Sequence, residues 1–544
     1  MRTARAVTGV AGAAVAVAAV TLVARVAGFG RWLVFEGSVG SGWVGTAYAG
    51  ANVVPNVLFE VVAGGALAAS VVPVLASSLA RGDSDEASRT ASALLTWTVL
   101  VLTPMALALA LLAGPVARLL LGPDTPAPVA DSAARMLVAF APQVVLYGVG
   151  IVLTGVLQAH RRFLGPALAP LLSTLVVVGV YVSFAVLTGS ADQPVNWLPG
   201  RAGEALLAWG TTAGVVALSL PLLLPARRTG VRLRPTLRLD AGTVRRVRAL
   251  AVAGLAGLVA QQALVLVTAR LATSAGGVGT INVYQYTQAV YLLPYAVLAV
   301  PLATASFPAL AGHAARADGE RFAAGLERST RAVVLVAVVG AAALVAVAPA
   351  VGAVFTALRG GSPALRAMPV ALTAFAPGLV GFALLAHQSR ALLAVHAARW
   401  VARCTVAGWG TALVASLILV PVLTRSTQDP PRAALLGLGA ASSLGMTLAG
   451  VLLLVGAGRL RVGSVPAGGW MGPAAPVLAR CLLVAAVAAV VGRLTTDLLL
   501  RPGMLAALLS GIAGALLTAG ALAGGLWLLD REDLRVLLSA RARP

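Results

Sequence analysis

Long apolar runs recur along the whole of this 544-residue chain, and several exceed the roughly 18 residues that predict a helix crossing a bilayer. Charge is scarce between them, because 11% of the residues are charged where globular domains carry about 25%. The runs are apolar throughout, whereas the strands of an outer-membrane barrel alternate apolar and polar residues. The sequence therefore predicts an all-α polytopic membrane protein and excludes a soluble enzyme.

Arginine, glycine and proline residues divide the apolar runs into about fourteen segments. We expect transmembrane spans at residues 6–27, 44–80, 91–114, 129–157, 164–189, 204–225, 248–274, 281–311, 331–357, 366–396, 400–424, 432–457, 474–498 and 502–529. The first segment follows basic residues as a signal peptide does, but its length and its lack of a clean cleavage site favour a retained helix. The second, eighth and tenth segments exceed the roughly 20 residues that a span needs. Their prolines are expected to kink them: Pro55, Pro73, Pro294, Pro301 and Pro377.

The distribution of arginine supports this count. The net charge is +22, and all 40 basic side chains are arginines, as a GC-rich genome would favour. With the N-terminus in the cytoplasm, 28 of the 40 fall in cytoplasmic loops, as the positive-inside rule requires. Such charge marks loops that face anionic lipid headgroups rather than a nucleic-acid site. We therefore expect a multi-pass protein of the cytoplasmic membrane with both termini inside the cell.

The loop after the sixth span is the richest in arginine, with eight between Arg227 and Arg248. It is interpreted either as a topology anchor at lipid headgroups or as a regulatory partner site. It divides the chain into a first lobe at residues 1–225, a linker at 226–248, a second lobe at 249–457, and a helix pair with a cytoplasmic tail at 458–544. Two lobes of six helices are typical of secondary transporters, in which the substrate site lies between the halves.

Few ionisable residues interrupt the spans, so each is a candidate for function. Arg25 and Arg31 flank Gly28 and Gly30, where we expect the helix to break. Two guanidinium groups can hold phosphate oxygens in bidentate fashion, although both can instead extend to the membrane interface. Glu60 is the only acid placed deep in a span, and it is expected to pair with one of these arginines or to bind a cation or proton.

A second polar group occurs in the seventh and eighth spans. Its members are Gln261, Gln262, Arg270, Asn282, Tyr284, Gln285, Tyr286, Gln288 and Tyr291. Gln285, Gln288 and Tyr291 recur at helical spacing, so one face could line a cavity or form hydrogen bonds between helices. No catalytic, cofactor or metal-ligand spacing is present among the four histidines, so we expect neither an enzyme nor a metal site.

Several motifs in order resemble one family. Residues 23–31 are similar to an S-R-x-x-G-F-x-R opening, residues 54–58 to L-P-N-L-L, and residues 65–67 and 72–75 to G-A-L and V-P-V-L. Residues 155–163 and 167–170 resemble a G-x-L-N-A…R-F…A-x-A-P block, and residues 285–286, 293–295 and 307–310 resemble Q-Y…L-P-Y…F-P-x-L. The chain thus resembles the MurJ/MviN lipid II flippases of the MATE-like exporter superfamily.

The resemblance implies a flippase that carries lipid-linked peptidoglycan precursor across the cytoplasmic membrane by alternating access. Arg25 and Arg31 match two arginines that the family uses to hold the pyrophosphate, and the last two helices are expected to shape a groove for the polyprenyl tail. The substrate-binding candidates are Arg25, Arg31, Asn56, Glu60, Gln261, Gln262, Arg270, Gln285 and Gln288. Expected partners are this lipid-linked pyrophosphate, membrane lipids and proteins of cell-wall synthesis, with no nucleic acid and no cofactor.

Some family positions differ in this chain. The paired arginines that follow L-P-N-L-L are Phe59 and Glu60 here, and an acid of the second span is Thr46. An arginine of the eighth span aligns near Ala289, and an acid after the tenth span aligns with His396. The expected cavity is therefore less basic than is usual in the family. This leaves two alternatives, an exporter of another polyprenyl-linked glycan or small molecule, and a non-transporting scaffold of cell-wall synthesis.

Overall fold

The computed structural model describes residues 2–61, 68–238, 241–359, 362–462, 465–466 and 471–529, and almost all of them are helical. The expected motif residues Gly65, Ala66 and Leu67 lie outside these ranges, as does the tail from residue 530. Contacts divide the chain into two compact units, Met1–Ser274 and Ala275–Pro544. Each unit is built around one long buried helix.

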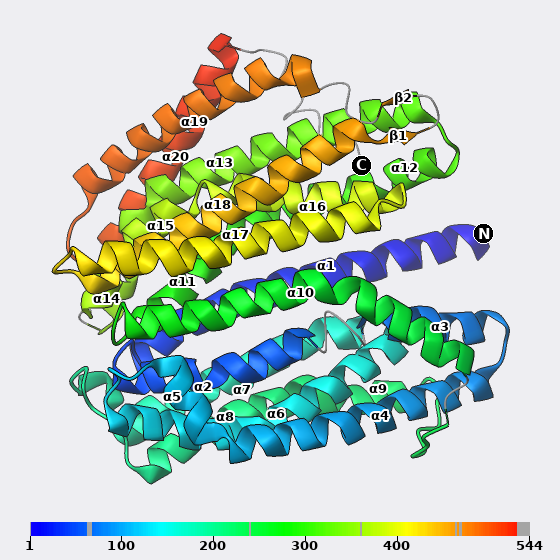
Figure 1. Ribbon diagram of the computed structural model, residues 1–544, viewed down its shortest axis with the longest axis horizontal. Coiled ribbons are helices and arrows are strands. Elements are labelled where there is room, and N and C mark those ends of the chain that lie inside the picture. The colour runs from blue at the N-terminus through cyan, green and yellow to red at the C-terminus, as the bar shows by residue number, and fades with distance from the viewer. Residues whose placement is uncertain are drawn as a thin grey trace. The chain divides into compact units, whose positions relative to one another are not determined.

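The first unit is organised around α6, which packs against α2, α3, α4, α5 and α8 (Figure 1). Its α-helices are α1 (Arg2–Ser38), α2 (Trp43–Glu60), α3 (Ala68–Ala80), α4 (Ser84–Leu111), α5 (Ala113–Leu121), α6 (Ala127–Ala159), α7 (Leu164–Thr188), α8 (Arg201–Ser219), α9 (Leu223–Arg227) and α10 (Ala241–Ser274). Two short turns, η2 (Ser190–Asp192) and η3 (Leu220–Leu222), join them. Because α6 is long and apolar on every side, the other helices can bury it.

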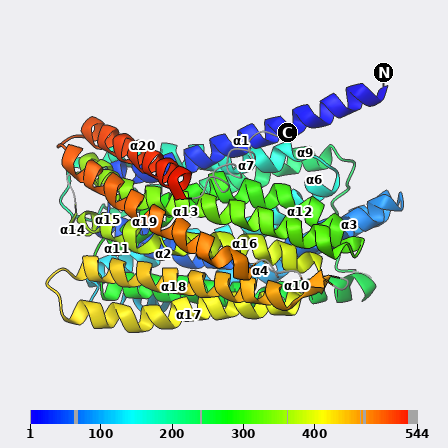
Figure 2. The same cartoon turned by 90° about the horizontal axis from the view of Figure 1, so that it is seen from above.

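The second unit is organised around α13, which packs against α12, α15, α16, α19 and α20. Its elements are α11 (Thr280–Pro294), η4 (Tyr295–Ala299), α12 (Val300–Ala315), α13 (Gly319–Arg359), α14 (Pro363–Arg366), α15 (Met368–Phe375), α16 (Gly378–Ala394), α17 (Ala398–Arg425), α18 (Pro430–Arg459), α19 (Met471–Leu499) and α20 (Met504–Leu529). The strands β1 (Arg461–Val462) and β2 (Val465–Pro466) form one antiparallel pair after α18. Helices α17 and α18 run side by side (Figure 2), and α19 and α20 lie along α13.

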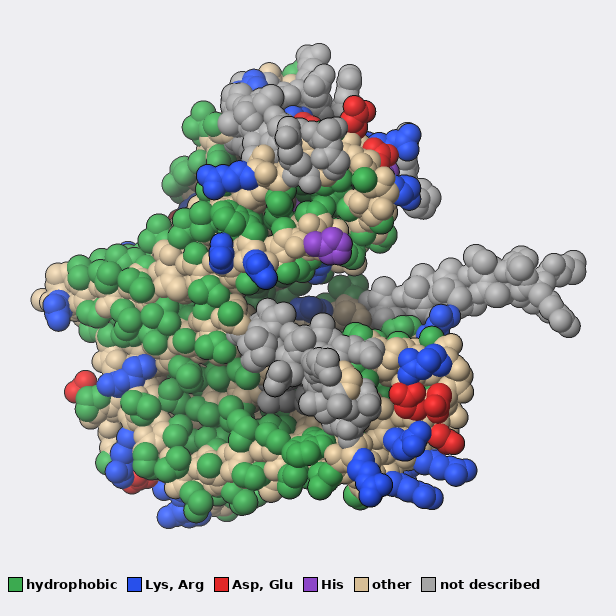
Figure 3. Space-filling view, turned by 45° about the vertical axis from the view of Figure 1, so that its right-hand side comes forward, with side chains coloured by type: hydrophobic (Ala, Val, Ile, Leu, Met, Phe, Trp, Pro, Cys, Tyr) green, Lys and Arg blue, Asp and Glu red, His purple; other side chains and the backbone are tan. Residues whose placement is uncertain are grey.

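Eleven helices in the described part of the chain are long and apolar enough to cross a membrane, or twelve when the bent pair of α15 and α16 is taken as one span. The all-helical membrane fold is confirmed, but the exact count of fourteen is not. The two expected spans beyond these twelve correspond to α1 and to the region of α2 and α3. On the face drawn in Figure 3, hydrophobic side chains form broad continuous surfaces while charged side chains gather in patches, as a lipid-facing protein requires.

Two of the three longest segments are interrupted within the described residues. The second segment contains α2 and α3, and residues 62–67 between them lie outside the described ranges. The eighth passes through the π-helical turn η4 directly after Pro294. The tenth bends by 44° at Pro377. The backbone groups freed at this bend are satisfied by α18, because the Ser443 hydroxyl accepts a hydrogen bond from the Gly378 amide (3.0 Å) and donates one to the Ala374 carbonyl (2.6 Å). A polar side chain from a neighbouring helix thus permits the kink.

The boundary between the two compact units falls between Ser274 and Ala275. Helix α10, expected to open the second lobe at residue 249, packs against α2, α3 and α5 of the first unit. Helices α19 and α20, expected as a separate terminal pair, belong to the second unit because α13 packs against both. The arginine-rich linker leaves α9 at Arg227 and reaches α10 at Ala241, while the side chains of Arg245, Arg246 and Arg248 lie outside the described residues.

Candidate functional site

Arg25 and Arg31 point to different environments. The predicted break at Gly28 and Gly30 is wrong, because α1 is continuous from Arg2 to Ser38 and both glycines have open space around them. Six residues on one helix are separated by about 9 Å along the axis and about 120° around it. Arg25 is accordingly exposed, while Arg31 is half-buried. The two guanidinium groups therefore do not form one clamp on this helix.

Arg31 lies in the interior of the first unit. Its guanidinium sits 5.1 Å from the centre of the Trp32 ring, and its charge acts on the phenols of Tyr48, Tyr147 and Tyr181. Its buried Nε has no hydrogen-bond partner among the described residues. A cation held against aromatic rings with a free N–H is suited to bind an anion.

The aromatic residues on which the charge of Arg31 acts are held by hydrogen bonds and ring contacts. The Tyr48 hydroxyl forms hydrogen bonds with the Tyr181 hydroxyl (2.8 Å) and the Thr211 hydroxyl (3.0 Å), and all three residues are buried. The Phe35 ring lies 5.3 Å from the Tyr48 ring and 5.1 Å from the Tyr181 ring. These contacts join α1, α2, α7 and α8, so the side chains around Arg31 are held in place by a buried network.

Asn56 and Glu60 are exposed on the last turns of α2. Within the described part of the chain, Glu60 forms no ion pair, so the expected pairing with Arg25 or Arg31 is not made. The neighbouring Phe59 ring packs 4.4 Å from the Tyr147 ring, and both line a cavity of about 250 Å³ within the first unit. The position where the family motif has an arginine is thus used here for apolar packing.

Two buried acids are not among the predicted site residues. Glu36 is 2% exposed and lies near the end of α1, and Glu204 is 4% exposed and lies near the start of α8. Both carboxylate oxygens of Glu204 accept hydrogen bonds of 2.6 Å from Nε and Nη2 of Arg135, which links α8 to α6. An arginine and a glutamate near the starts of two neighbouring spans were the available signal for this pair.

The candidates on α10 take part in helix packing. Gln262 is 5% exposed and Gln261 is half-buried. The guanidinium of Arg270 fills the space beside Gly122, whose φ of +96° and lack of a Cβ allow the close approach. Nη1 of Arg270 is buried without a hydrogen-bond partner in the part of the chain that the structure describes. Arg270 therefore retains an N–H group that can donate to a further acceptor.

The polar face predicted on α11 makes one hydrogen bond within the helix and ring contacts with α15. Gln288 donates a hydrogen bond from Nε2 to the Tyr284 hydroxyl (2.8 Å), one turn earlier. The rings of Tyr284 and Tyr291 pack on Phe375 of α15, with centroids 5.6 and 5.3 Å away. Gln285 is half-buried on the same helix. The hydrogen bond of Gln288 lies within α11 and Tyr291 makes a ring contact with α15, so neither cavity lining nor hydrogen bonding between helices is decided for this face.

An apolar groove occupies the second unit between α13, α16, α18 and α19, and its volume is about 590 Å³. Its walls are nearly all aliphatic, with Val334, Val338 and Ala342 on α13 and Leu482, Ala485 and Ala489 on α19. Along α13 it extends from Arg331 to Val345, which is about 21 Å of helix. Its shape and lining suit a long aliphatic chain.

One end of this groove is polar. Arg331 lines it and pairs with Glu327 at 2.8 Å, while its buried Nε has no partner among the described residues. Beside it, the Ser329 hydroxyl contacts Nε2 of His387 at 3.1 Å, and Gln388 donates to the Thr330 hydroxyl at 2.8 Å. The groove therefore combines a long apolar wall with an arginine–glutamate pair at its end.

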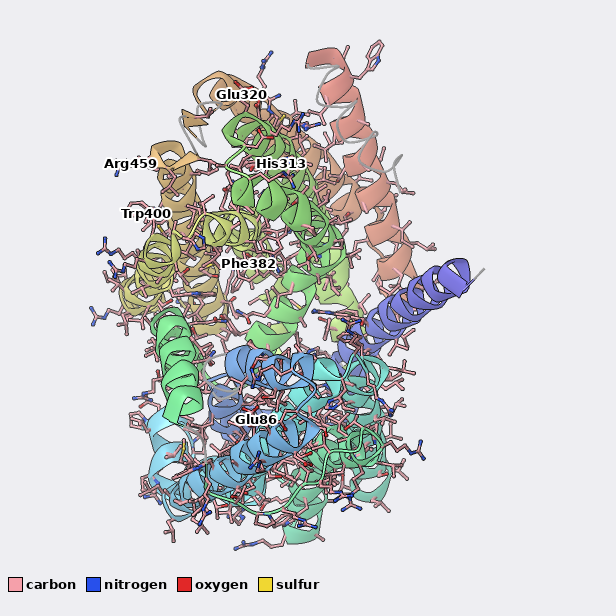
Figure 4. All side chains as sticks on the ribbon, turned by 90° about the vertical axis from the view of Figure 1, so that its right-hand side faces the viewer. Glu86, His313, Glu320, Phe382, Trp400 and Arg459 are labelled. Atoms are coloured by element: carbon pink, nitrogen blue, oxygen red, sulfur yellow. The ribbon has the colours of Figure 1, made fainter. Side chains whose placement is uncertain are left out.

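The same end of the second unit carries further charge. Helix α12 ends near His313, α13 begins near Glu320, and α18 ends at Arg459, so all three lie at one end of these helices (Figure 4). Phe382 lies farther along α16, where its ring packs 4.6 Å from that of Tyr295. Charged helix ends and aromatic or aliphatic helix centres are the pattern of a membrane-spanning bundle.

A match between the sequence and one family model assigns the chain to a family. A family model described as Lipid II flippase MurJ matches residues 37–511. The chain belongs to this family. The resemblance inferred from the motifs is thereby confirmed, and the chain is a multi-pass membrane protein of the MurJ family.

Relatives in three organisms are similar to parts of the chain. A probable lipid II flippase MurJ of Synechocystis sp. is 32% identical over 212 residues, which is 39% of each chain. One of Rhizobium tropici is 26% identical and covers 54% of this chain and 53% of its own. A lipid II flippase MurJ of Burkholderia cenocepacia is 26% identical, and the match covers 67% of this chain and 69% of that relative. The chain therefore matches less than two thirds of the length of the first two.

Two solved structures establish the fold. The inward closed conformation of lipid II flippase MurJ has a TM-score of 0.73 at 15% identity and covers 95% of this chain and 99% of its own. An inward-facing MATE family multidrug resistance transporter has a TM-score of 0.63 at 14% identity and covers 83% and 95%. The MATE-like architecture expected from the sequence is thus confirmed.

Proposed function

We propose that the protein is a flippase that translocates lipid-linked peptidoglycan precursor, lipid II, across the cytoplasmic membrane by alternating access. Membership of the MurJ family supports this activity, and the arginine distribution supports placing both termini in the cytoplasm. The observation that carries the proposal is the apolar groove of the second unit with Arg331 at its end. The long hydrocarbon of a polyprenyl pyrophosphate matches the aliphatic lining of this groove.

The groove is proposed to hold the polyprenyl tail. Because the tail leaves lipid rather than water, packing against the aliphatic lining rather than the hydrophobic effect would hold it in the groove. The headgroup pyrophosphate is proposed to bind Arg31, whose Nε is buried and free of hydrogen bonds within the described residues. Arg25, Asn56, Glu60, Gln261, Gln262, Arg270, Gln285 and Gln288 remain proposed substrate contacts.

Filling the groove tests the tail site. Leu482→Trp and Val490→Trp each place an indole in the groove, and Leu516→Trp on α20 is the matched control, because the three residues are 51%, 56% and 67% exposed. An indole that fills part of the groove should exclude the tail by steric overlap. We expect both groove variants, but not the control, to lose complementation in a flippase-depleted strain. Equal complementation by all three at equal membrane abundance would contradict the tail site.

The arginines provide a second test. Arg31→Gln removes a charged donor to the pyrophosphate, worth about 1.5–3 kcal/mol, and should reduce precursor translocation at least about tenfold. Arg25→Gln should have the smaller effect, because Arg25 is exposed on another face of α1. The readout is the amount of precursor accessible on the outer leaflet. A larger loss with Arg25→Gln than with Arg31→Gln would refute the assignment of Arg31.

A second candidate is export of a different polyprenyl-linked glycan. It is favoured by Phe59 and Glu60, which stand where the family motif carries arginines and leave less positive charge for the headgroup. Depletion of the protein followed by analysis of intracellular lipid-linked precursors distinguishes the two. Accumulation of lipid II supports the first function, and accumulation of another lipid-linked glycan supports the second. A scaffold without transport would cause neither to accumulate.

A further inference from the structure

The arginine-rich linker is fixed to α4 in a regular way. Three hydroxyl residues one helical turn apart, Ser88, Ser92 and Thr96, form what we call the hydroxyl ladder of α4. The amides of residues 232, 234 and 236 donate to these hydroxyls in turn, at 3.4, 3.0 and 3.2 Å. The Ser92 hydroxyl also donates to the carbonyl of residue 232, at 3.2 Å. The linker therefore runs along α4 as an extended segment.

The spacing of the hydroxyls along α4 matches the spacing of every second amide along the linker. Four residues of helix advance about 6.0 Å, and two residues of extended chain advance about 6.6 Å, so every second linker amide meets the next hydroxyl. Because side chains alternate on an extended segment, Val231 and Leu233 face the helices while Arg232 and Arg234 are exposed. The ladder thus fixes both the position of the linker and the direction of its arginines.

Between this segment and α4 lies a second groove within the first unit, with a volume of about 650 Å³. Leu95, Val99 and Leu223 form part of its apolar floor, and Arg227, Arg232 and Arg234 line it. None of these arginines forms an ion pair with a described residue. The groove therefore places unpaired positive charge beside an open apolar surface.

We propose that this linker groove binds an anionic phospholipid of the bilayer, with its phosphate at Arg227, Arg232 and Arg234 and an acyl chain on the apolar floor. Charge complementarity supports this occupant, because the groove has cationic side chains on its rim and aliphatic side chains below them. The site is separate from the groove of the second unit, which has α13 and α19 as its walls.

The experiment measures phosphatidylglycerol and phosphatidylcholine retained by the purified full-length protein, by native mass spectrometry. We expect the wild type to retain more phosphatidylglycerol than phosphatidylcholine. Arg232→Gln with Arg234→Gln should weaken its binding about 30-fold, since each arginine near an anionic lipid contributes about fivefold. Arg399→Gln with Arg403→Gln, two exposed arginines of α17, is the matched control and should leave binding unchanged.

Val99→Trp separates a lipid from a purely anionic ligand. Val99 is 39% exposed, so an indole there fills the groove without disturbing a buried position or changing the charge. A phospholipid should be lost from this variant as from the double arginine variant. Phosphatidylglycerol binding that depends on the arginines but not on Val99→Trp would show that no acyl chain lies on the apolar floor and would overturn the proposal. Equal retention of both lipids by the wild type would also overturn it.

Discussion

Replacing Glu204 with glutamine tests how much a buried ion pair stabilises the first unit. Glu204 is 4% exposed and receives two hydrogen bonds of 2.6 Å from Arg135, whose side chain is 34% exposed. Removing one partner of a fully buried pair costs about 3–5 kcal/mol. Because water reaches part of Arg135 and glutamine still accepts one hydrogen bond, we expect Glu204→Gln to lower the free energy of unfolding by about 2 kcal/mol.

Two comparisons isolate the cause. Arg135→Met with Glu204→Leu removes both charges and keeps similar volume, so it should cost less than Glu204→Gln alone. Asp497→Asn removes one partner of the exposed pair of Arg493 and Asp497, separated by 2.9 Å and one helical turn, and should cost about 0.3–0.5 kcal/mol. Thermal unfolding of the purified protein in detergent ranks the three variants.

We expect the three variants to differ in stability in a strict order. Glu204→Gln should be the least stable of the three, because it alone leaves an unpaired charge between packed helices. A cost for Glu204→Gln no greater than that for Asp497→Asn would refute the buried-pair argument. A double variant less stable than Glu204→Gln would refute it as well, because the charges themselves would then be stabilising.

Further predictions concern helix packing and the linker. Gly381→Ala should lower the unfolding temperature, because its Cβ would collide with a backbone carbonyl of α18, whereas Gly410→Ala on α17, with open space around it, should be neutral or stabilising. Equal unfolding temperatures for the two variants would contradict this packing. Ser92→Ala with Thr96→Val should release the linker from α4, so trypsin should cleave residues 232–238 faster than in the wild type. Unchanged cleavage in a time course would show that the hydroxyl ladder does not hold the segment.

The sequence predicted the elements whose cause is local. A run of about 20 apolar residues must form a helix in a bilayer, because no other backbone conformation satisfies its own hydrogen bonds there. For the same reason Pro294 and Pro377, which cannot donate such bonds, marked interruptions that the structure confirms in η4 and at the 44° bend. The motifs around Arg31 and Asn56 also sufficed to indicate the family.

Predictions from the sequence were wrong or left open where a residue's environment depends on which helices pack together. Glycine at positions 28 and 30 suggested a break, yet α1 remains continuous because nothing in that stretch removes a backbone hydrogen bond. Gln285 and Gln288 could have faced a cavity or a neighbour with equal local cost. Only the packing of α11 on Phe375 determines that Tyr291 and Tyr284 lie against α15.

By itself, the sequence determined a helical membrane protein of the MurJ family with arginine concentrated in its loops. The tertiary structure decided which charges are buried and where the grooves lie. It brought Arg135 to Glu204, directed Arg31 inward and Arg25 outward, and placed α19 against α13 to form an apolar groove. Hydropathy fixes how deeply a helix enters the membrane, but only side-chain packing fixes its rotation and its neighbours, and these decide what each residue contacts.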